Sequence, residues 1–351
     1  MTPNTKKQMN DAIAAARMTA LTAWLNAALG RSDYSLEPAS ADASFRRYFR
    51  ITLGGQTSIV MDAPPEHEDC RPFVKVAALM AEAGVPAPQV LAQDLAQGFL
   101  LLTDMGRQTY LEVLNEANAD ALLRGAGDTL IKWQLASKPA VLPAYDNALL
   151  MRELSLFPDW YIAKHLQVEL TSDQQGTLQA VFAAIVTANL AQASVYVHRD
   201  YMPRNLMVCP ALPVNVPGVL DFQDAVYGPI SYDIASLYKD AFISWDEERV
   251  LDGTIRYWEK AKKAGLPVPP DFGDFYRDAE WMALQRHLKV LGIFARINYR
   301  DGKPKYLADT PRFINYVRRT GERYTALFPL MRLFDKLKID DGVEKIVGYS
   351  F

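Results

Sequence analysis

The stretch 195–224 restricts the possible folds of this chain more than any other. It holds His198, Asp200 and Asn205 in the spacing H-x-D-x4-N, and Asp221 follows sixteen residues after Asn205. The apolar runs around them are rich in β-branched residues, broken by Pro and Gly and typical of small strands: residues 195–197, 206–208 and 216–220. The polar residues are therefore expected on tight loops between strands.

Loops of this kind suit the transfer of a phosphoryl group. Asp200 can accept the proton of a substrate hydroxyl, and Asn205 and Asp221 offer hard oxygen ligands to Mg²⁺, which proteins usually bind through one or two carboxylates plus substrate phosphates. Each motif alone is also typical of ordinary turns, since Asp and Asn commonly cap and turn a chain. Their occurrence together and in this order favours the functional interpretation.

With the sequence G-P-I-S-Y-D at 228–233 following these motifs, the chain resembles the aminoglycoside phosphotransferase and choline kinase-like family. This resemblance implies an α+β, protein-kinase-like fold of two lobes. A small β-rich lobe with one packed helix would cover the nucleotide over residues 1–102. A hinge would follow at 103–108, and a larger, mainly α lobe at 109–351 would carry the catalytic and acceptor-binding residues. ATP and Mg²⁺ are the implied cofactors.

The patterns along the chain agree with that division. Residues 35–64 are strand-like, with a hairpin at Gly54-Gly55, and further strands are expected at 90–91 and 99–102. Apolar residues at helical spacing predict a helix over 71–83 that buries Phe73, Val76, Ala77 and Met80. Further on, apolar spacings of three and four predict helices over 110–135, 148–165, 172–193, 232–241, 247–264, 275–297 and 310–328.

The hinge is expected at Thr103, Asp104 and Met105, where an apolar strand gives way to a helical pattern. By resemblance, backbone groups of these residues bind adenine. A plain strand-to-helix loop without a ligand would use the same residues.

Two features of kinase-like folds are missing from the sequence. Residues 39–45 stand where a glycine-rich loop is expected, and they contain no glycine. The third strand has Met61 or Asp62 in place of its usual lysine. Because phosphoryl transfer requires neutralised phosphate charge, we expect Arg46 or Arg47 to substitute; the alternative is that both are solvated charges at a sheet edge.

Other polar residues near the motif are expected to support it. By resemblance, His198 buttresses the loop, and Asp233 holds the loop by accepting hydrogen bonds. Asp224 is either a second metal contact or a loop carboxylate, and the sequence leaves this open.

Composition narrows the class of protein. A net charge of -3 argues against a nucleic-acid-binding protein, without excluding a local basic patch. Cys70 and Cys209 lack metal or disulfide spacing, which suits a reducing compartment and predicts a cytoplasmic protein. Residues 9–29 are interrupted by polar side chains, so we expect an amphipathic helix packed on the small lobe, rather than a membrane segment; a membrane-surface helix is the alternative. No obligatory protein partner is indicated.

The acceptor is expected to be neutral or anionic, because residues 281–320 hold nine basic and two acidic residues. Several runs, among them S-F-R-R-Y-F-R at 44–50 and H-R-D-Y-M-P-R-N-L-M-V at 198–208, are also similar to the bacterial anomeric kinases of N-acetylmuramate and N-acetylglucosamine. That resemblance implies ATP-dependent phosphorylation of the 1-hydroxyl of these amino sugars during peptidoglycan recycling. Arg296, Arg300 or Lys303 would pair with the lactyl carboxylate of N-acetylmuramate.

Two alternatives to the sugar kinase remain open. The chain resembles other small-molecule kinases of the same fold, of the aminoglycoside or choline type. The missing lysine and glycine loop also fit a non-catalytic nucleotide-binding scaffold, although a scaffold has no need for Asp200, Asn205 and Asp221 together.

Overall fold

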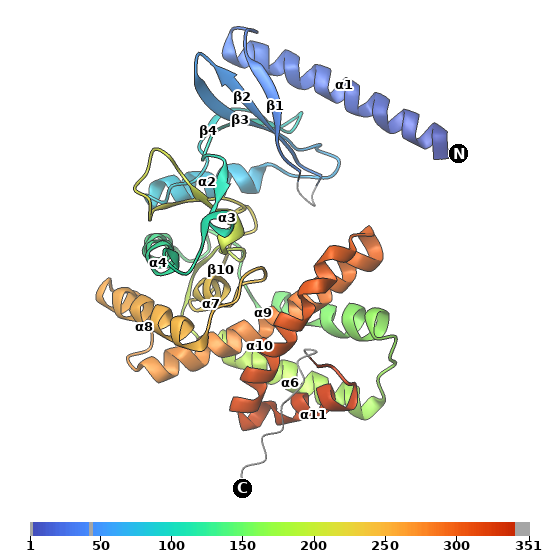
Figure 1. Cartoon of the computed structure of the whole chain (residues 1–351), viewed down its shortest axis with the longest axis vertical. Coiled ribbons are helices and arrows are strands. Elements are labelled where there is room, and N and C mark those ends of the chain that lie inside the picture. The colour runs from blue at the N-terminus through green and yellow to red at the C-terminus, as the bar shows by residue number, and fades with distance from the viewer. Residues whose placement is uncertain (1–2, 42–44, 341–351) are drawn as a thin grey trace. The chain divides into compact units, whose positions relative to one another are not determined.

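The computed structural model describes residues 3–41 and 45–340. The chain divides into two compact units, the first comprising Met1–Glu82 and Pro86–Gly106, the second Ala83–Val85 and Arg107–Phe351. The first unit is rich in strands and the second is mainly helical (Figure 1). The predicted α+β class is confirmed.

The first unit is built on an antiparallel sheet of five strands in the order β1-β2-β3-β5-β4. Its elements are α1 Pro3–Leu29, β1 Ser35–Ala41, β2 Arg47–Leu53, β3 Gln56–Asp62, α2 Arg71–Glu82, β4 Val90–Asp94 and β5 Phe99–Thr103. The predicted hairpin joins β2 to β3 through Gly54 and Gly55, whose φ angles of 57° and 82° favour glycine. The predicted loop at 39–45 is shorter, because β1 continues to Ala41, and residues 42–44 lie outside the described residues.

Helix α1 packs on this sheet, as its apolar spacing predicts. Leu21 and Leu25 are one turn apart and fully buried, and they share a core with Ile51, Val60 and Phe99 from the strands. In Figure 1 the C-terminal part of α1 lies along the sheet, while its first turns extend beyond it. The four residues predicted to be buried in α2 are also buried.

The second unit surrounds the long helix α9. Its strands form the sheets β10-β7 and β6-β8-β9. Its elements are β6 Gln108–Thr109, α3 Tyr110–Val113, α4 Ala119–Leu135, α5 Asn147–Leu156, a π-helix Phe157–His165, α6 Ser172–Leu190, β7 Ser194–Val197, a 3-10 turn Pro203–Asn205, β8 Leu206–Val208, β9 Pro217–Val219, β10 Val226–Pro229, α7 Tyr232–Tyr238, α8 Glu247–Lys263, α9 Phe272–Asp301, a 3-10 helix Pro304–Asp309, α10 Thr310–Arg323, a 3-10 turn Thr325–Leu327 and α11 Phe328–Lys336.

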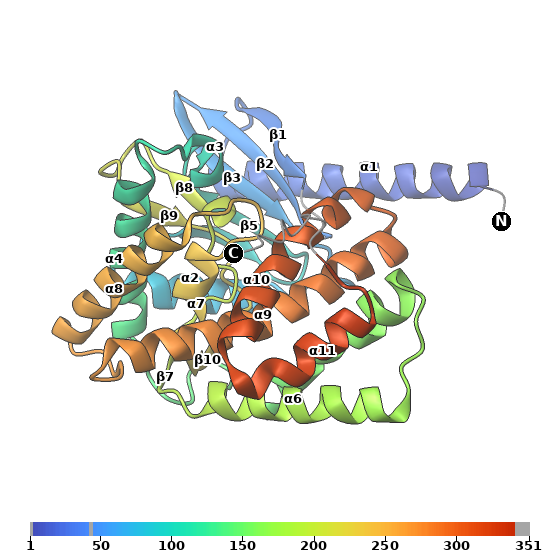
Figure 2. The same ribbon diagram turned by 60° about the horizontal axis from the view of Figure 1, so that its bottom comes forward.

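Helix α9 is the centre of this unit. It contacts α5, α6, α7, α10 and the π-helix, and Figure 2 shows α10 beside α9 and α11 beside α6. Most of its middle section is buried, including the polar residues Glu280, Gln285, Arg286 and Lys289. Buried polar side chains need partners, so α9 brings charged groups into the interior of the unit. Within residues 3–41 and 45–340, no helix has the length and apolar character needed to cross a membrane.

The predicted helix over 148–165 is not a single α-helix. It changes at Phe157 into a π-helix of nine residues. Pro158 lacks an N–H and its ring crowds the carbonyl four residues earlier, so the α-helical pattern cannot continue there. The wider π pattern is visible at its end, where Leu166 N–H donates to Tyr161 at 3.0 Å, five residues back.

The predicted helix over 110–135 is also interrupted, between α3 and α4. The Asn118 side chain accepts a hydrogen bond from Asn115 N–H at 2.8 Å and donates to the Val113 carbonyl at 2.9 Å. Asparagine side chains that bond the nearby backbone compete with helical hydrogen bonds, which explains the break.

Candidate active site

Two antiparallel strand pairs bring the predicted catalytic base and the two predicted metal ligands together within the second unit. In one pair, Val197 at the end of β7 lies opposite Val226 at the start of β10. In the other, Leu206 at the start of β8 lies opposite Val219 at the end of β9. The connection from β7 to β8, which begins at His198 and ends at Asn205, therefore lies beside the loop that follows β9.

Asn205 connects the two other predicted residues, Asp200 and Asp221. Its Nδ2 donates to the Asp200 carbonyl at 2.9 Å and lies 3.4 Å from Asp221 Oδ2. Its own carbonyl accepts from Leu220 N–H at 2.9 Å. Gln223 Nε2 donates to Asp221 Oδ1 at 2.8 Å. The structure thus collects the candidate base and both candidate metal ligands at one place.

Two residues of these loops adopt a left-handed backbone conformation, which residues other than glycine rarely take. Arg199 has a φ of 76° and Asp221 a φ of 63°. Such a conformation costs about 1–3 kcal/mol and persists only where surrounding contacts impose it. Arg199 directly precedes Asp200, so strain is concentrated at the two predicted carboxylates.

His198 and Asp233 hold this loop from inside. The His198 and Arg199 N–H groups donate to the two oxygens of the Asp233 carboxylate, at 2.7 and 3.0 Å. His198 Nε2 donates to the Leu220 carbonyl at 3.0 Å, and its Nδ1 accepts from Asp200 N–H at 3.2 Å. Both ring nitrogens are therefore engaged in fixing the backbone.

Burial determines the protonation of both groups. It lowers the pKa of the His198 imidazole to about 4, despite the nearby Asp200. It raises the pKa of the Asp233 carboxyl to about 7, against the opposing effect of the two N–H groups that it accepts. His198 is therefore neutral at pH 7, and its position suits support of the loop.

Sequence reasoning missed a buried acid behind this loop, Glu153 on α5. Arg199 Nη2 donates to its Oε1, which also lies 2.9 Å from Lys289 Nζ on α9. Its Oε2 accepts from the Tyr145 hydroxyl and from Gln285 Nε2, the latter at 3.1 Å. Burial raises the pKa of the Glu153 carboxyl, but Lys289 and Arg199 more than offset this and bring it to about 2. A glutamate within a helical pattern gave no sign of this role.

The donor set for a metal is small. Among the described residues, no three His, Cys, Asp or Glu side chains form a group able to hold an ion. Asn205 and Asp221 offer an amide oxygen and a carboxylate, and the Asp224 side chain is exposed. This chemistry fits a divalent cation that takes its remaining ligands from phosphates and water.

In the first unit, both predicted phosphate-binding arginines are paired with acids. Arg47 Nε donates to Asp62 Oδ2 at 2.9 Å, and Arg17 of α1 contacts the other oxygen of Asp62 at 2.7 Å. Asp62 is fully buried, whereas the Arg47 side chain is 36% exposed. Arg46 lies 3.4 Å from Glu68. The acid at the usual lysine position therefore holds two arginines.

The predicted hinge residues are fixed within the same unit. Thr103 belongs to β5, and its Oγ1 accepts from Gln89 N–H at 2.9 Å. Arg50 Nε donates to Asp104 Oδ2 at 2.6 Å, and Arg50 Nη2 donates to the Gly106 carbonyl at 2.7 Å. Through Arg50, the Asp104 carboxylate thus fixes the backbone on both sides of Met105.

The predicted acceptor residues lie at the C-terminal end of α9 and just beyond it. Arg296 follows Lys289 by two helical turns on the same face, so it is about 10 Å further along the axis. Arg296 Nε is buried and finds no acceptor within the described part of the chain. Arg300 pairs with Asp301 at 2.7 Å on the surface, and Lys303 is exposed. Arg296 therefore differs from the other two.

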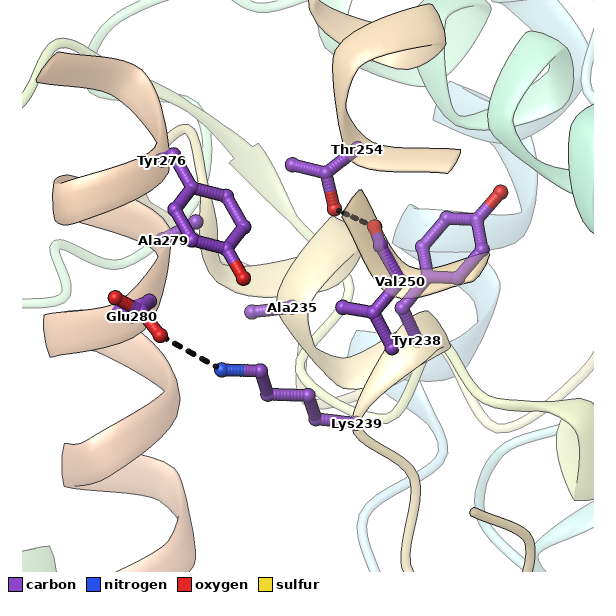
Figure 3. A pocket seen from close by; sticks show the side chains of 8 residues that line it. All are labelled: Ala235, Tyr238, Lys239, Val250, Thr254, Tyr276, Ala279 and Glu280. Carbon is purple, nitrogen blue, oxygen red and sulfur yellow. Dashed lines mark hydrogen bonds and ion pairs between the residues drawn. The ribbon is translucent and has the colours of Figure 1, made fainter. Parts of the chain in front are cut away.

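A small pocket between α7, α8 and α9 is a separate feature (Figure 3). Lys239 Nζ faces Glu280 Oε1 there at 3.4 Å. Glu280 also pairs with Arg323 at 2.5 Å and accepts from the Tyr324 hydroxyl at 2.7 Å. None of the predicted site residues lines this pocket, and its charged groups satisfy one another. We therefore assign it to the packing of these helices.

Comparison with known proteins identifies a family and several relatives of this chain. Residues 35–270 match the model of the phosphotransferase enzyme family. The chain is 57% identical over 302 residues to an N-acetylmuramate/N-acetylglucosamine kinase of Pseudomonas aeruginosa, an alignment that covers 86% of this chain and 88% of the relative. It is 49% identical over 340 residues to a protein of the same name in Neisseria meningitidis, covering 95% and 99%.

A solved structure shares the fold at much lower identity. The choline kinase of Streptococcus pneumoniae superposes with a TM-score of 0.57 at 12% identity, over 89% of this chain and 99% of that one. At that identity the likeness concerns the fold alone.

Proposed function

The chain belongs to the phosphotransferase enzyme family, and from that premise we propose that it phosphorylates the anomeric 1-hydroxyl of N-acetylmuramate and N-acetylglucosamine with ATP. The observation that supports phosphoryl transfer is that Asp200, Asn205 and Asp221 lie together, with the Asn205 amide nitrogen close to both aspartates. The relatives named above, whose alignments cover 86% and 95% of the chain, support the choice of acceptor. The product would enter the recycling of peptidoglycan sugars.

Asp200 is the proposed catalytic base. Asn205 bonds its carbonyl and His198 accepts from its N–H. These contacts fix the backbone of Asp200 and therefore the direction in which its side chain leaves the loop. The anomeric hydroxyl is more acidic than an ordinary alcohol, which lowers the demand on a carboxylate base. His198 is neutral and both its nitrogens are engaged, which supports a positioning role for it.

Members of the family use ATP and a divalent metal ion, and we propose Mg²⁺ for this chain. The Asn205 amide oxygen and the Asp221 carboxylate would hold it, because the Asn205 amide nitrogen is already bonded to Asp200. When bound, the cation offsets negative charge on the phosphates. Gln223 restrains the Asp221 carboxylate through Oδ1 and so limits the directions from which Asp221 can bind.

Arg47 and Arg46 are the proposed cations for the nucleotide phosphates. The buried Asp62 fixes the Arg47 guanidinium without covering it, since more than a third of that side chain remains exposed. Arg46 is more buried, with 14% of its side chain exposed, and its Nε lies 3.4 Å from Glu68 Oε2. Adenine would bind to the backbone of Thr103, Asp104 and Met105, where the Arg50 contacts with Asp104 and Gly106 fix the chain.

Arg296, Arg300 and Lys303 are proposed to recognise the acidic acceptor. N-acetylmuramate carries a lactyl carboxylate that N-acetylglucosamine lacks, and a guanidinium pairs well with a carboxylate. Arg296 is the strongest candidate of the three, because its Nε is buried and has no acceptor among the residues that the structure describes. An unmet donor of this kind favours an anionic ligand.

The proposal is tested by measuring ADP release by the purified chain with Mg-ATP and a panel of acceptors: both amino sugars, aminoglycosides and choline. Release is expected with the two sugars and not with the others. The methyl 1-glycoside of N-acetylglucosamine should be inert, since its 1-hydroxyl is blocked. Phosphorylation of that glycoside would disprove the anomeric assignment, and no release with any acceptor would favour the scaffold.

A further inference from the structure

The backbone of Arg199 is held in its unusual conformation by two independent restraints. Its φ of 76° belongs to the left-handed region, where Cβ crowds the carbonyl oxygen of a non-glycine residue. One restraint is the hydrogen bond from Arg199 N–H to Asp233 at 3.0 Å. The other acts through the side chain, at the opposite end of the residue.

The Arg199 guanidinium connects three segments of the second unit. Nη2 donates to Glu153 on α5, and Nη1 donates to the Asp224 carbonyl at 3.3 Å. Asp224 lies three residues after Asp221 in the loop that follows β9. A single side chain therefore ties the loop of Asp200 and the loop of Asp221 to the same helix.

Glu153 is built to be a fixed anchor. Its side chain is 6% exposed, and both oxygens are occupied: Oε1 by Arg199 and Lys289, Oε2 by Tyr145 and Gln285. Lys289 and Gln285, both on α9, contact different oxygens of the carboxylate, and these two contacts are enough to keep it from rotating. The Tyr145 ring also lies 5.8 Å from the Arg199 guanidinium carbon and limits its movement.

We propose that Glu153 is a positioning residue of the phosphoryl transfer: by anchoring the Arg199 side chain, it keeps the Arg199 backbone left-handed and so sets the direction of Asp200. Glu153 acts through Arg199 and contacts neither the phosphates nor the acceptor. This inference rests on the function proposed above, because it assigns the purpose of the anchor to the Asp200 carboxylate.

The decisive experiment compares Glu153→Gln in two backgrounds of the full chain, with ATP and N-acetylmuramate as substrates. In the wild-type background, Glu153→Gln should lower kcat about five- to thirtyfold, because the substitution removes the side-chain restraint that holds the left-handed backbone of Arg199. Both KM values should stay within about twofold. Glycine takes positive φ without steric cost, so in the Arg199→Gly background the same substitution should change kcat less than about threefold.

In this comparison, either an unchanged kcat in Glu153→Gln or the same loss in both backgrounds would overturn the proposal. Tyr145→Phe is the matched control, because it removes a donor to Oε2 but keeps the ring and the Oε1 contact with Arg199. It should lower the unfolding midpoint and leave kcat within about twofold. A loss in Tyr145→Phe equal to that in Glu153→Gln would also contradict a specific anchor.

A structural measurement keeps the test independent of the acceptor. In a crystal structure of Glu153→Gln, Arg199 should leave the left-handed region and lose its N–H contact with Asp233; an unchanged φ overturns the anchor. If Glu153→Gln does not fold, Glu153→Gln/Lys289→Met replaces it, since that variant also removes the ammonium left without its acid. A wild-type chain inactive on both sugars disproves the proposed function, and the crystal structure still decides the anchor.

Discussion

At the scale of single residues, the site departs from ordinary backbone geometry where its chemistry is proposed. Arg199 and Asp221 are left-handed without being glycine, and each lies in or beside a predicted carboxylate position. Strain of this kind is found at functional sites, where surrounding contacts offset its cost. Here those contacts come from Asp233, Glu153 and Gln223.

Replacing the proposed base should remove activity and leave the fold. Asp200→Asn should lower kcat about a hundred- to ten-thousandfold, the usual contribution of a positioned general base, with KM for ATP and the unfolding midpoint near wild type. Steady-state kinetics and thermal unfolding measure both. Asp224→Asn is the control: it keeps the carbonyl that contacts Arg199, and kcat should stay within about threefold. Near-normal turnover in Asp200→Asn would exclude Asp200 from the mechanism.

His198 should make folding stability depend on pH. Its pKa is about 4 in the folded chain, against about 6.5 when unfolded. The stabilising effect of the neutral imidazole is therefore complete above about pH 6.5 and is lost as the pH falls toward 4, by about 1.4 kcal/mol per pH unit. Urea unfolding of the wild type and of His198→Gln between pH 7 and 4.5 measures it.

The difference between these two proteins is the informative quantity. Asp233, with its pKa raised to about 7, contributes with the opposite sign: its stabilisation is present at low pH and is lost as the pH rises through 7. His198→Gln keeps the backbone N–H that Asp233 accepts, so that contribution cancels in the difference. A difference that does not change with pH would contradict a neutral, buried His198.

Arg296 offers a test of acceptor recognition. Arg296→Gln should raise KM for N-acetylmuramate about ten- to a hundredfold, the value of a charge-assisted hydrogen bond, and leave KM for N-acetylglucosamine nearly unchanged. Arg300→Gln is the comparison, because Arg300 already pairs with Asp301 and should have the smaller effect. Equal increases for both sugars would remove the carboxylate contact from the proposal.

At the scale of helices and strands, the crossing of α5 and α9 depends on a single glycine. A Cβ added at Gly292 of α9 would lie 2.3 Å from the Leu156 carbonyl carbon and oxygen, where α5 passes into the π-helix. Backbone atoms cannot move aside cheaply, so these two elements approach as closely as their main chains permit. This crossing supports α5, which carries Glu153.

Gly292→Ala should therefore destabilise the chain, by about 1–3 kcal/mol as overpacking usually does. Urea unfolding measures the change. Gly176→Ala in α6 is the matched control, because its Cβ would meet nothing within 4 Å and alanine favours an exposed helix by about 0.5–1 kcal/mol. Stability that is unchanged or raised in Gly292→Ala would mean that the two helices can move apart.

At the scale of the whole chain, charge is distributed unevenly. The net charge is -3, yet residues 281–320 carry nine basic and two acidic residues. Some of these bases are neutralised inside the second unit, as Lys289 is by Glu153 and Arg312 by Asp309. Lys303 is exposed, and Arg296 lacks an acceptor for its Nε within the described residues. A local positive field therefore remains at the end of α9.

That positive field should make kcat/KM depend on salt for N-acetylmuramate and not for N-acetylglucosamine. Because the Debye length falls from about 30 Å at 0.01 M to about 8 Å at 0.15 M, kcat/KM for anionic N-acetylmuramate should decrease with ionic strength. N-acetylglucosamine is neutral and serves as the internal control, so its kcat/KM should stay level. Parallel decreases for both sugars would place the salt effect on ATP binding instead.

Short-range patterns of residues were enough to predict several features of this protein. The spacing of His198, Asp200 and Asn205 on strand-bounded loops predicted the chemistry, and apolar periodicity predicted most of the helices and the buried face of α2. The helix predicted over 310–328 ends at Arg323, and a 3-10 turn separates it from α11. These patterns are reliable because each is written within a few neighbouring residues. The change to a π-helix at Phe157 was missed, although Pro158 marked the place, because the pattern of apolar residues continues through it.

Which charged side chains pair with one another depends on how distant segments of the chain pack. Arg199 and Glu153 are 46 residues apart in sequence, and Arg17 and Asp62 are 45 apart; neither pair leaves a periodic trace. Whether a buried glutamate anchors a loop depends on where α5, α9 and β7 are packed, since an ion pair is set by distance in space. For the same reason, the sequence offered Arg46 and Arg47 as phosphate-binding cations without showing that Asp62 and Glu68 hold them.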